Sequence, residues 1–138
     1  MTLTPVESTL FARRSVRAFA PDLVPRADIE RLLRAARSAP SGANLQPGRF
    51  HVLTGAPLAA LSAELVAASE SGRPMVSEYS YFPQPMPADL KAKQRAAGYA
   101  LYASLGIGRR DVDARRNQFN ANYRFFDAPV GVVVSIRR

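Results

Sequence analysis

The sequence contains no cysteine in its 138 residues, which excludes disulfide bonds, thiolate catalysis and cysteine-ligated zinc. Its only histidine, His51, lies in a segment with the composition of a β-strand, and we interpret it as structural rather than as a general base. The acidic residues are dispersed, so no close carboxylate pair is available for glycosidase-type chemistry. No plausible set of metal ligands is present. Side-chain acid–base, nucleophilic and metal catalysis therefore have little support.

Long apolar runs are also missing, and none approaches the roughly 20 residues that cross a bilayer. The N-terminus has no secretory pattern. Its serine, threonine and arginine content also fits a transit peptide, but Thr4, Pro5 and Glu7 better match a helix start with a capping box. Neither a GxGxxG loop nor a P-loop occurs, so a Rossmann or NTPase fold lacks its phosphate cradle. We expect a cytoplasmic protein with no membrane partner.

The charge balance is strongly basic, with 19 lysines and arginines against 11 acidic residues and a net charge of +8. Such a balance favours an anionic partner, which would be nucleic acid, acidic lipid or a phosphorylated cofactor. The arginines are scattered over several segments, which argues against nucleic acid as the partner and leaves a phosphorylated cofactor open. The apolar content of 47% is enough to build a core.

Hydrophobic periodicity and turn residues predict alternating helices and a few strands. The expected helices cover residues 5–12, 26–37, 58–69, 88–105 and 111–118, and the expected strands cover residues 50–53 and 131–136. The second strand is an unbroken apolar run, which suits burial on both faces. Two strands form only a marginal sheet. We therefore expect residues 1–138 to be the N-terminal part of a single domain.

A first group of polar side chains, Arg13, Arg14, Ser15 and Arg17, follows the first expected helix. Guanidinium groups bind phosphate through paired hydrogen bonds, and serine adds a donor. If the segment is extended, Arg13, Ser15 and Arg17 point to one side and would meet one anion. A solvated basic helix end, favoured by the helix dipole, explains the same residues.

A second group forms a short loop between two prolines, at Pro40, Ser41, Gly42, Asn44 and Gln46. Glycine allows close approach of the backbone, and the two amides carry donors and acceptors that suit the edge of a flat heteroaromatic ring. The same loop also serves as an ordinary helix-to-strand connection.

Two further segments combine amides, arginine and aromatic residues. Asn120, Asn122 and Arg124 precede the second expected strand and suit a polyol phosphate, although the aromatics beside them also explain the segment as a loop anchored to the core. A proline-rich segment over residues 72–87 contains Tyr79, Tyr81 and Phe82, and a loop of this length is usually a lid or a disordered link. Because a flavin carries out electron transfer itself, a site of arginines, amides and aromatics without a base fits a flavoprotein.

Four segments in this order resemble the nitroreductase family. Residues 13–19 (RRSVRAF) resemble its RRSxRxF signature, and residues 39–47 (APSGANLQP) resemble its APSxxNxQP loop. Residues 98–111 look like the subgroup that contains nitrobenzoate reductases, and residues 122–130 fit the lead-in to the family's central strand. The resemblance covers nearly the whole chain.

The resemblance implies a three-layer α+β fold and an intertwined homodimer with FMN at its interface. It also implies that NAD(P)H reduces FMN, which then reduces a nitroaromatic or quinone-like small aromatic substrate. Arg13, Arg14, Ser15 and Arg17 would hold FMN from one subunit, and Pro40, Ser41, Gly42, Asn44 and Gln46 from the other. Arg124, with Asn120 or Asn122, would contact the ribityl chain or the pyrimidine edge, and Tyr79, Tyr81 and Phe82 would line the substrate side.

The length departs from the family pattern, because family members have about 200 residues, one full domain. We therefore expect an incomplete fold, lacking the C-terminal half with its dimer-core helix and a flavin-binding glycine loop. The alternative function is a truncated, inactive relative with weak or no flavin binding. Every 1,000 Å² or so of apolar surface left uncovered forfeits about 25 kcal/mol of stabilisation, at about 25 cal/mol/Å². That loss exceeds a typical net stability of about 5–15 kcal/mol. We predict that this chain alone is at best marginally folded.

Overall fold

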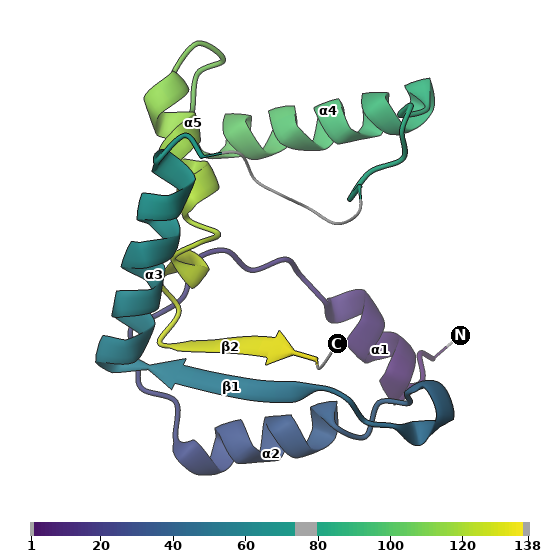
Figure 1. The fold of residues 1–138 in the computed structure, drawn as a ribbon. Coiled ribbons are helices and arrows are strands. Elements are labelled where there is room, and N and C mark those ends of the chain that lie inside the picture. The colour runs from purple at the N-terminus through teal and green to yellow at the C-terminus, as the bar shows by residue number, and fades with distance from the viewer. Residues whose placement is uncertain (1, 74–79, 137–138) are drawn as a thin grey trace. The chain divides into compact units, whose positions relative to one another are not determined.

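The computed structural model describes residues 2–73 and 80–136, and in these residues it contains five α-helices, two 3-10 helices and two strands (Figure 1). The elements in chain order are α1 Pro5–Ala12, α2 Arg26–Ala36, η1 Gly42–Asn44, β1 Arg49–Thr54, α3 Gly55–Glu70, α4 Ala88–Ser104, α5 Val112–Asn120, η2 Phe125–Asp127 and β2 Val130–Ser135. Every predicted helix and strand is present, with ends displaced by less than one helical turn.

The chain divides into two compact units. Unit 1 consists of Met1–Leu58 with Phe126–Arg138, and unit 2 consists of Ala59–Phe125. Unit 1 therefore carries α1, α2, the start of α3 and both strands, whereas unit 2 carries the rest of α3 together with α4 and α5. The single domain expected from the sequence stays a prediction.

Helix α1 begins with the predicted capping box. The Glu7 amide donates to Thr4 Oγ1 at 3.3 Å, and the Thr4 amide donates to Glu7 Oε2 at 2.8 Å. Pro5 occupies the first turn, where its missing N–H costs nothing. These contacts satisfy two backbone donors that a helix start otherwise leaves open, so the start of α1 is determined locally.

Strands β1 and β2 pair antiparallel, with Val52 opposite Val132 and His51 opposite Val133. Helix α2 lies along β1 (Figure 1), and a crevice of about 410 Å³ between them is lined by Ile29 and Leu33 of the helix and by Val52 of the strand. Ile29 and Leu33 thus face the sheet, whereas Leu32 of the same helix is 62% exposed. Arg26 and Glu30 also line this crevice, and Arg26 Nε donates to Glu30 Oε1 at 2.7 Å.

The prediction that the second strand is buried on both faces is wrong for the described part of the chain. Val132, Val133 and Val134 of β2 are 41%, 38% and 56% exposed. The physical reason is that β1 is the only strand paired with β2 in the described residues, so the sheet has two strands and little covers its apolar side chains. The apolar run indicates a preference for burial that these residues alone do not satisfy.

Unit 2 is held partly by a buried amide. Asn120, at the end of α5, is 1% exposed. Its Oδ1 accepts from Ser69 Oγ at 3.2 Å, and its Nδ2 donates to Glu70 Oε1 at 2.7 Å. Both partners lie at the end of α3, so one side chain joins α3 to α5. A buried amide needs such partners, because a buried polar group without a hydrogen bond costs more free energy than a formed hydrogen bond contributes.

Candidate functional site

The segment that follows α1 brings three polar side chains together in unit 1. Arg13 Nη1 donates to Ser15 Oγ at 3.3 Å, and Arg17 Nη1 donates to the Ser15 carbonyl oxygen at 3.3 Å. Both arginines therefore reach the same serine, as alternate residues of an extended segment are expected to do. We call Arg13, Ser15 and Arg17 the arginine–serine cluster. All three are exposed, so their remaining donors are accessible to an anion.

Arg14 turns away from this cluster. Its Nη1 donates to the Phe11 carbonyl oxygen at 2.8 Å and to the Arg13 carbonyl oxygen at 3.0 Å. These contacts place its positive charge at the C-terminal end of α1, where a cation offsets the helix dipole. Arg14 therefore fits the explanation of a basic helix end, whereas anion binding by Arg13, Ser15 and Arg17 stays a prediction.

Arg17 also lies over an aromatic ring that the sequence did not associate with it. Its Cζ is 6.0 Å from the centre of the Phe126 ring, at the limit of a cation–π contact. Phe126 lies in η2, where Phe125, Phe126 and Asp127 have φ values of 54°, 53° and 58°. Side-chain-bearing residues rarely adopt this left-handed conformation, so surrounding contacts must hold it. No local signal in the sequence pairs these two distant positions.

The loop at Ser41–Gln46, here called the amide loop, is organised by its own side chains. Ser41 Oγ accepts from the Gln46 amide at 2.9 Å. Gln46 Nε2 donates to the Ala39 carbonyl oxygen at 3.1 Å and to Asn44 Oδ1 at 3.0 Å. Ala43, Asn44 and Gln46 all have positive φ, which makes the turn tight. A Cβ at Gly42 would meet nothing within 4 Å, so the space beside the loop is open.

No hydrogen bond or ion pair joins the arginine–serine cluster to the amide loop within residues 2–73 and 80–136. The resemblance implies that these two segments hold one cofactor from different subunits, and this stays a prediction. Each segment nevertheless has a fixed local geometry. Pro40 and Gly42 carry no hydrogen-bonding group in their side chains, so they contribute through the path of the backbone.

The remaining predicted site residues lie in unit 2. Asn120 is buried and bonded to α3, whereas Asn122 is exposed and its Nδ2 donates to the Phe119 carbonyl oxygen at 2.8 Å. The structure thus favours Asn122 over Asn120 as the amide that a ligand can approach, a choice that the sequence left open. Arg124 is half-buried at the end of this unit.

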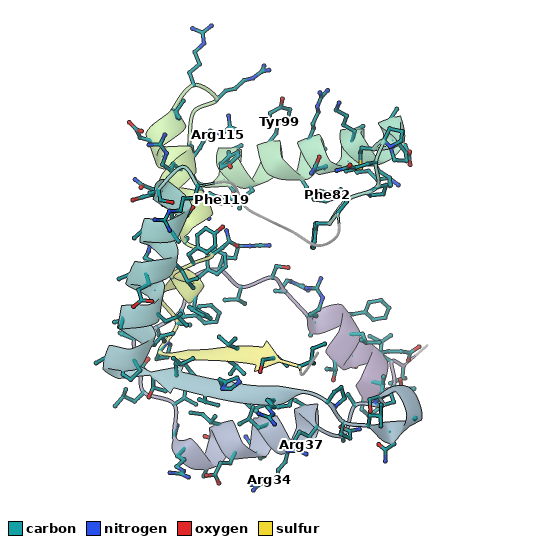
Figure 2. All side chains as sticks on the ribbon, in the orientation of Figure 1. Arg34, Arg37, Phe82, Tyr99, Arg115 and Phe119 are labelled. Carbon is teal, nitrogen blue, oxygen red and sulfur yellow. The ribbon has the colours of Figure 1, made fainter. Side chains whose placement is uncertain are left out.

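The aromatic pair of the proline-rich segment is also in unit 2. The rings of Tyr81 and Phe82 meet edge to face, with centroids 4.8 Å apart, and Tyr81 is 82% exposed. Figure 2 shows Phe82 in the stretch before α4. Tyr79 lies outside the described residues. His51, interpreted as structural, has its Nε2 2.9 Å from Ser135 Oγ on the neighbouring strand.

Comparison with known proteins decides the family. The model of the nitroreductase family matches residues 10–138. The chain belongs to the nitroreductase family. It is 37% identical over 129 residues to a 4-nitrobenzoate reductase of Nocardioides sp. (strain LMS-CY), covering 91% of this chain and 52% of that protein. It is 35% identical over 130 residues to a 4-nitrobenzoate reductase of Pseudomonas putida, covering 94% and 56%.

Solved structures confirm the nitroreductase-like α+β fold. The chain superimposes on the FMN- and NADPH-dependent nitroreductase NfnB from sphigopyxis sp. strain HMH with a TM-score of 0.87 and 39% identity, covering 98% of this chain and 61% of that one. For NfnB from Mycobacterium smegmatis in complex with NADPH, the TM-score is 0.84 and the identity 32%, covering 95% and 59%.

The chain spans slightly more than half the length of the curated relatives that it matches, and about three fifths of the solved ones. This nitroreductase-family chain therefore corresponds to only part of each relative. Among its described helices, none has the length and apolar character needed to cross a membrane.

Proposed function

We propose that this nitroreductase-family chain belongs to an FMN-dependent oxidoreductase that uses NAD(P)H to reduce nitroaromatic or quinone-like substrates. The observation that carries the proposal is the convergence of Arg13 and Arg17 on Ser15, in the segment that bears the family signature. Relatives named as 4-nitrobenzoate reductases, and neighbours described as FMN- and NADPH-dependent, support the same function.

The residues present fit the chemistry of FMN. Its phosphate is an anion, and the arginine–serine cluster offers two exposed guanidinium groups and a hydroxyl with donors to spare. Arg14 lies beside the cluster and adds positive charge without pointing into it. When bound, the flavin would supply the redox chemistry, which the side chains of this sequence do not provide.

The amide loop fits the edge of a flat heteroaromatic ring. Gln46 Nε2 donates to Asn44 Oδ1, which leaves Asn44 Nδ2 as a donor and Gln46 Oε1 as an acceptor for a ligand. The internal bonds from Ser41 fix the direction of these two groups before any ligand arrives. A preorganised loop of this kind orients a ring at a lower entropic cost than a mobile one. We propose that it serves the flavin of a partner subunit.

Unit 2 supplies the remaining contacts in this proposal. Arg124 and Asn122 would bind the ribityl chain or the pyrimidine edge, and Tyr81 with Phe82 would line the substrate side. These two rings are perpendicular, with an interplanar angle of 89°, so each can offer a small aromatic substrate a ring face or a ring edge. Tyr79 belongs to the same proposal. We further propose a homodimer in the cytoplasm, where NAD(P)H is available, as the sequence resemblance implies.

Consumption of NAD(P)H tests the function. The protein is supplied with FMN, with 4-nitrobenzoate and with either NADPH or NADH. Oxidation of the nicotinamide is followed by the loss of absorbance of its reduced form. We expect oxidation that requires both FMN and the nitro compound, and that benzoate, which has no nitro group, does not stimulate it. Oxidation at an equal rate without added flavin would contradict the proposal.

A further inference from the structure

Two arginines meet at the corner between α4 and α5, within unit 2, in a place that the proposed function does not use. Arg109 Cζ lies 5.8 Å from the centre of the Tyr99 ring on α4, and Arg115 Cζ lies 4.7 Å from the centre of the Tyr102 ring. Figure 2 shows Tyr99 standing out from α4 and Arg115 near the junction with α5. Arg115 Nη1 also donates to the Arg109 carbonyl oxygen at 3.1 Å.

Neither guanidinium group has a carboxylate partner among residues 2–73 and 80–136. In the same residues the pairs that do form are Arg26 with Glu30, Arg31 with Asp28, Lys93 with Asp89 and Arg116 with Asp113. The acids nearest the corner along the chain are used elsewhere, since Asp111 Oδ1 accepts from the Ala114 amide at the start of α5. Within the described residues, Arg109 and Arg115 therefore form no ion pair with a carboxylate.

The two arginines line a pocket of about 200 Å³, together with Tyr99, Tyr102, Ala103 and Ile107. That volume is several times the roughly 30 Å³ that one water molecule occupies in the liquid. No acidic residue lines it. Because both guanidinium groups lie against tyrosine rings, they are held in position before a ligand arrives, which lowers the entropic cost of binding.

We propose that this corner binds a phosphate group with close to two negative charges, either inorganic phosphate or a phosphate monoester. A phosphate monoester carries close to two negative charges at neutral pH and so matches two guanidinium groups, whereas a carboxylate matches one. Arg115 uses one N–H for the Arg109 carbonyl oxygen and keeps the others for the ligand. The phosphate comes either from free inorganic phosphate or from a nucleotide, whose base would stack on the half-exposed Tyr99.

Calorimetric titration of the full chain tests the proposal, in an Arg17→Gln background and without FMN, because FMN carries a phosphate monoester that would itself occupy the corner. The probes are inorganic phosphate, adenosine 2′-monophosphate and benzoate. Arg109→Gln removes one guanidinium group but keeps the carbonyl oxygen that Arg115 bonds. Arg110→Gln is the matched control, because it makes the same charge change on the next residue, which does not line the pocket.

We expect Arg109→Gln to lower the affinity for both phosphate ligands about tenfold or more, the effect of losing a charged hydrogen bond. Arg110→Gln should change these affinities less than about twofold. Adenosine 2′-monophosphate binding tighter than inorganic phosphate would identify a nucleotide as the source, and equal binding would identify free phosphate. Equal loss in the two variants, or benzoate binding as tightly as phosphate, would overturn the proposal.

A second measurement does not depend on a variant folding. In the wild-type chain, the side-chain Nε–H signals of Arg109 and Arg115 should shift in the ¹H–¹⁵N spectrum as inorganic phosphate is added. The Arg110 signal should move much less. Shifts of all three signals by the same amount would indicate diffuse attraction to a basic surface and would overturn the proposal.

Discussion

Asn120 is the side chain whose role differs most between sequence and structure. Its sequence context suggested a cofactor contact, and the structure places it at 1% exposure between Ser69 and Glu70. The motif alone does not separate it from Asn122, because both are amides at the same end of α5. Burial, which depends on α3, separates them.

Replacement of Asn120 by alanine should lower the free energy of unfolding by about 1–3 kcal/mol, because Ser69 and Glu70 lose their buried partner. Urea denaturation followed by circular dichroism measures this loss. Asn122→Ala is the matched control, since Asn122 is exposed and bonds only a nearby carbonyl oxygen. A loss no larger than that of the control would show that the amide does not join α3 to α5.

At the scale of elements, most of the secondary structure could be predicted because its signals are local. The capping box of α1 involves residues three apart, and the apolar stripe of α2 needs only the periodicity of one helix. The left-handed turn of η2 could not be predicted, because residues such as Phe126 adopt it only under tertiary constraint. The exposure of β2 was missed for a related reason, since an apolar run indicates a preference for burial and not what covers it.

The capping box of α1 should stabilise the helix less at acidic pH. The hydrogen bonds from the Thr4 amide and hydroxyl hold the pKa of the Glu7 carboxyl below its ordinary value of 4.5. Because the pKa is lower in the folded state than in the unfolded state, the cap stabilises α1 fully above the unfolded value. This contribution is lost as pH falls through the folded value.

An NMR titration of the Glu7 carboxyl carbon checks this. Thr4→Ala removes the hydroxyl and weakens the cap, so the pKa of Glu7 should rise towards its ordinary value. Thr9→Ala is a suitable control, because Thr9 Oγ1 donates to the Pro5 carbonyl oxygen and does not touch Glu7. Identical pKa values for Glu7 in the wild type and in Thr4→Ala would show that the Thr4 hydroxyl does not stabilise the Glu7 carboxylate.

At the scale of the whole molecule, exposed apolar side chains dominate the described residues. Val6, Leu10 and Phe11 of α1 are 68%, 66% and 68% exposed, and Ile136 after β2 is 67% exposed. Only Leu58 and Ala121 form buried apolar positions among the described residues. Exposed faces of this kind favour association with further apolar surface. The structure therefore agrees with the low stability predicted from the sequence, which remains to be measured.

Thermal unfolding of the chain by itself should be broad, with a midpoint below the roughly 45 °C at which mesophilic domains begin to unfold. Saturating FMN should raise the midpoint, because a ligand that binds only the folded state stabilises it by mass action. Differential scanning calorimetry at two protein concentrations measures both effects. A sharp, cooperative transition at high temperature without FMN would show that the exposed apolar faces lower the stability of the chain very little.

The central claim is that the arginine–serine cluster binds the phosphate of FMN, and flavin fluorescence titration tests it most directly. Arg17→Gln is compared with Arg37→Gln, which makes the same charge change at the residue that follows α2 and is labelled in Figure 2. The account predicts that the wild-type chain and Arg37→Gln bind FMN alike and that Arg17→Gln binds at least about tenfold more weakly, as expected for a charged hydrogen bond. Equal affinity of both variants, or no FMN binding by the wild-type chain, would contradict it.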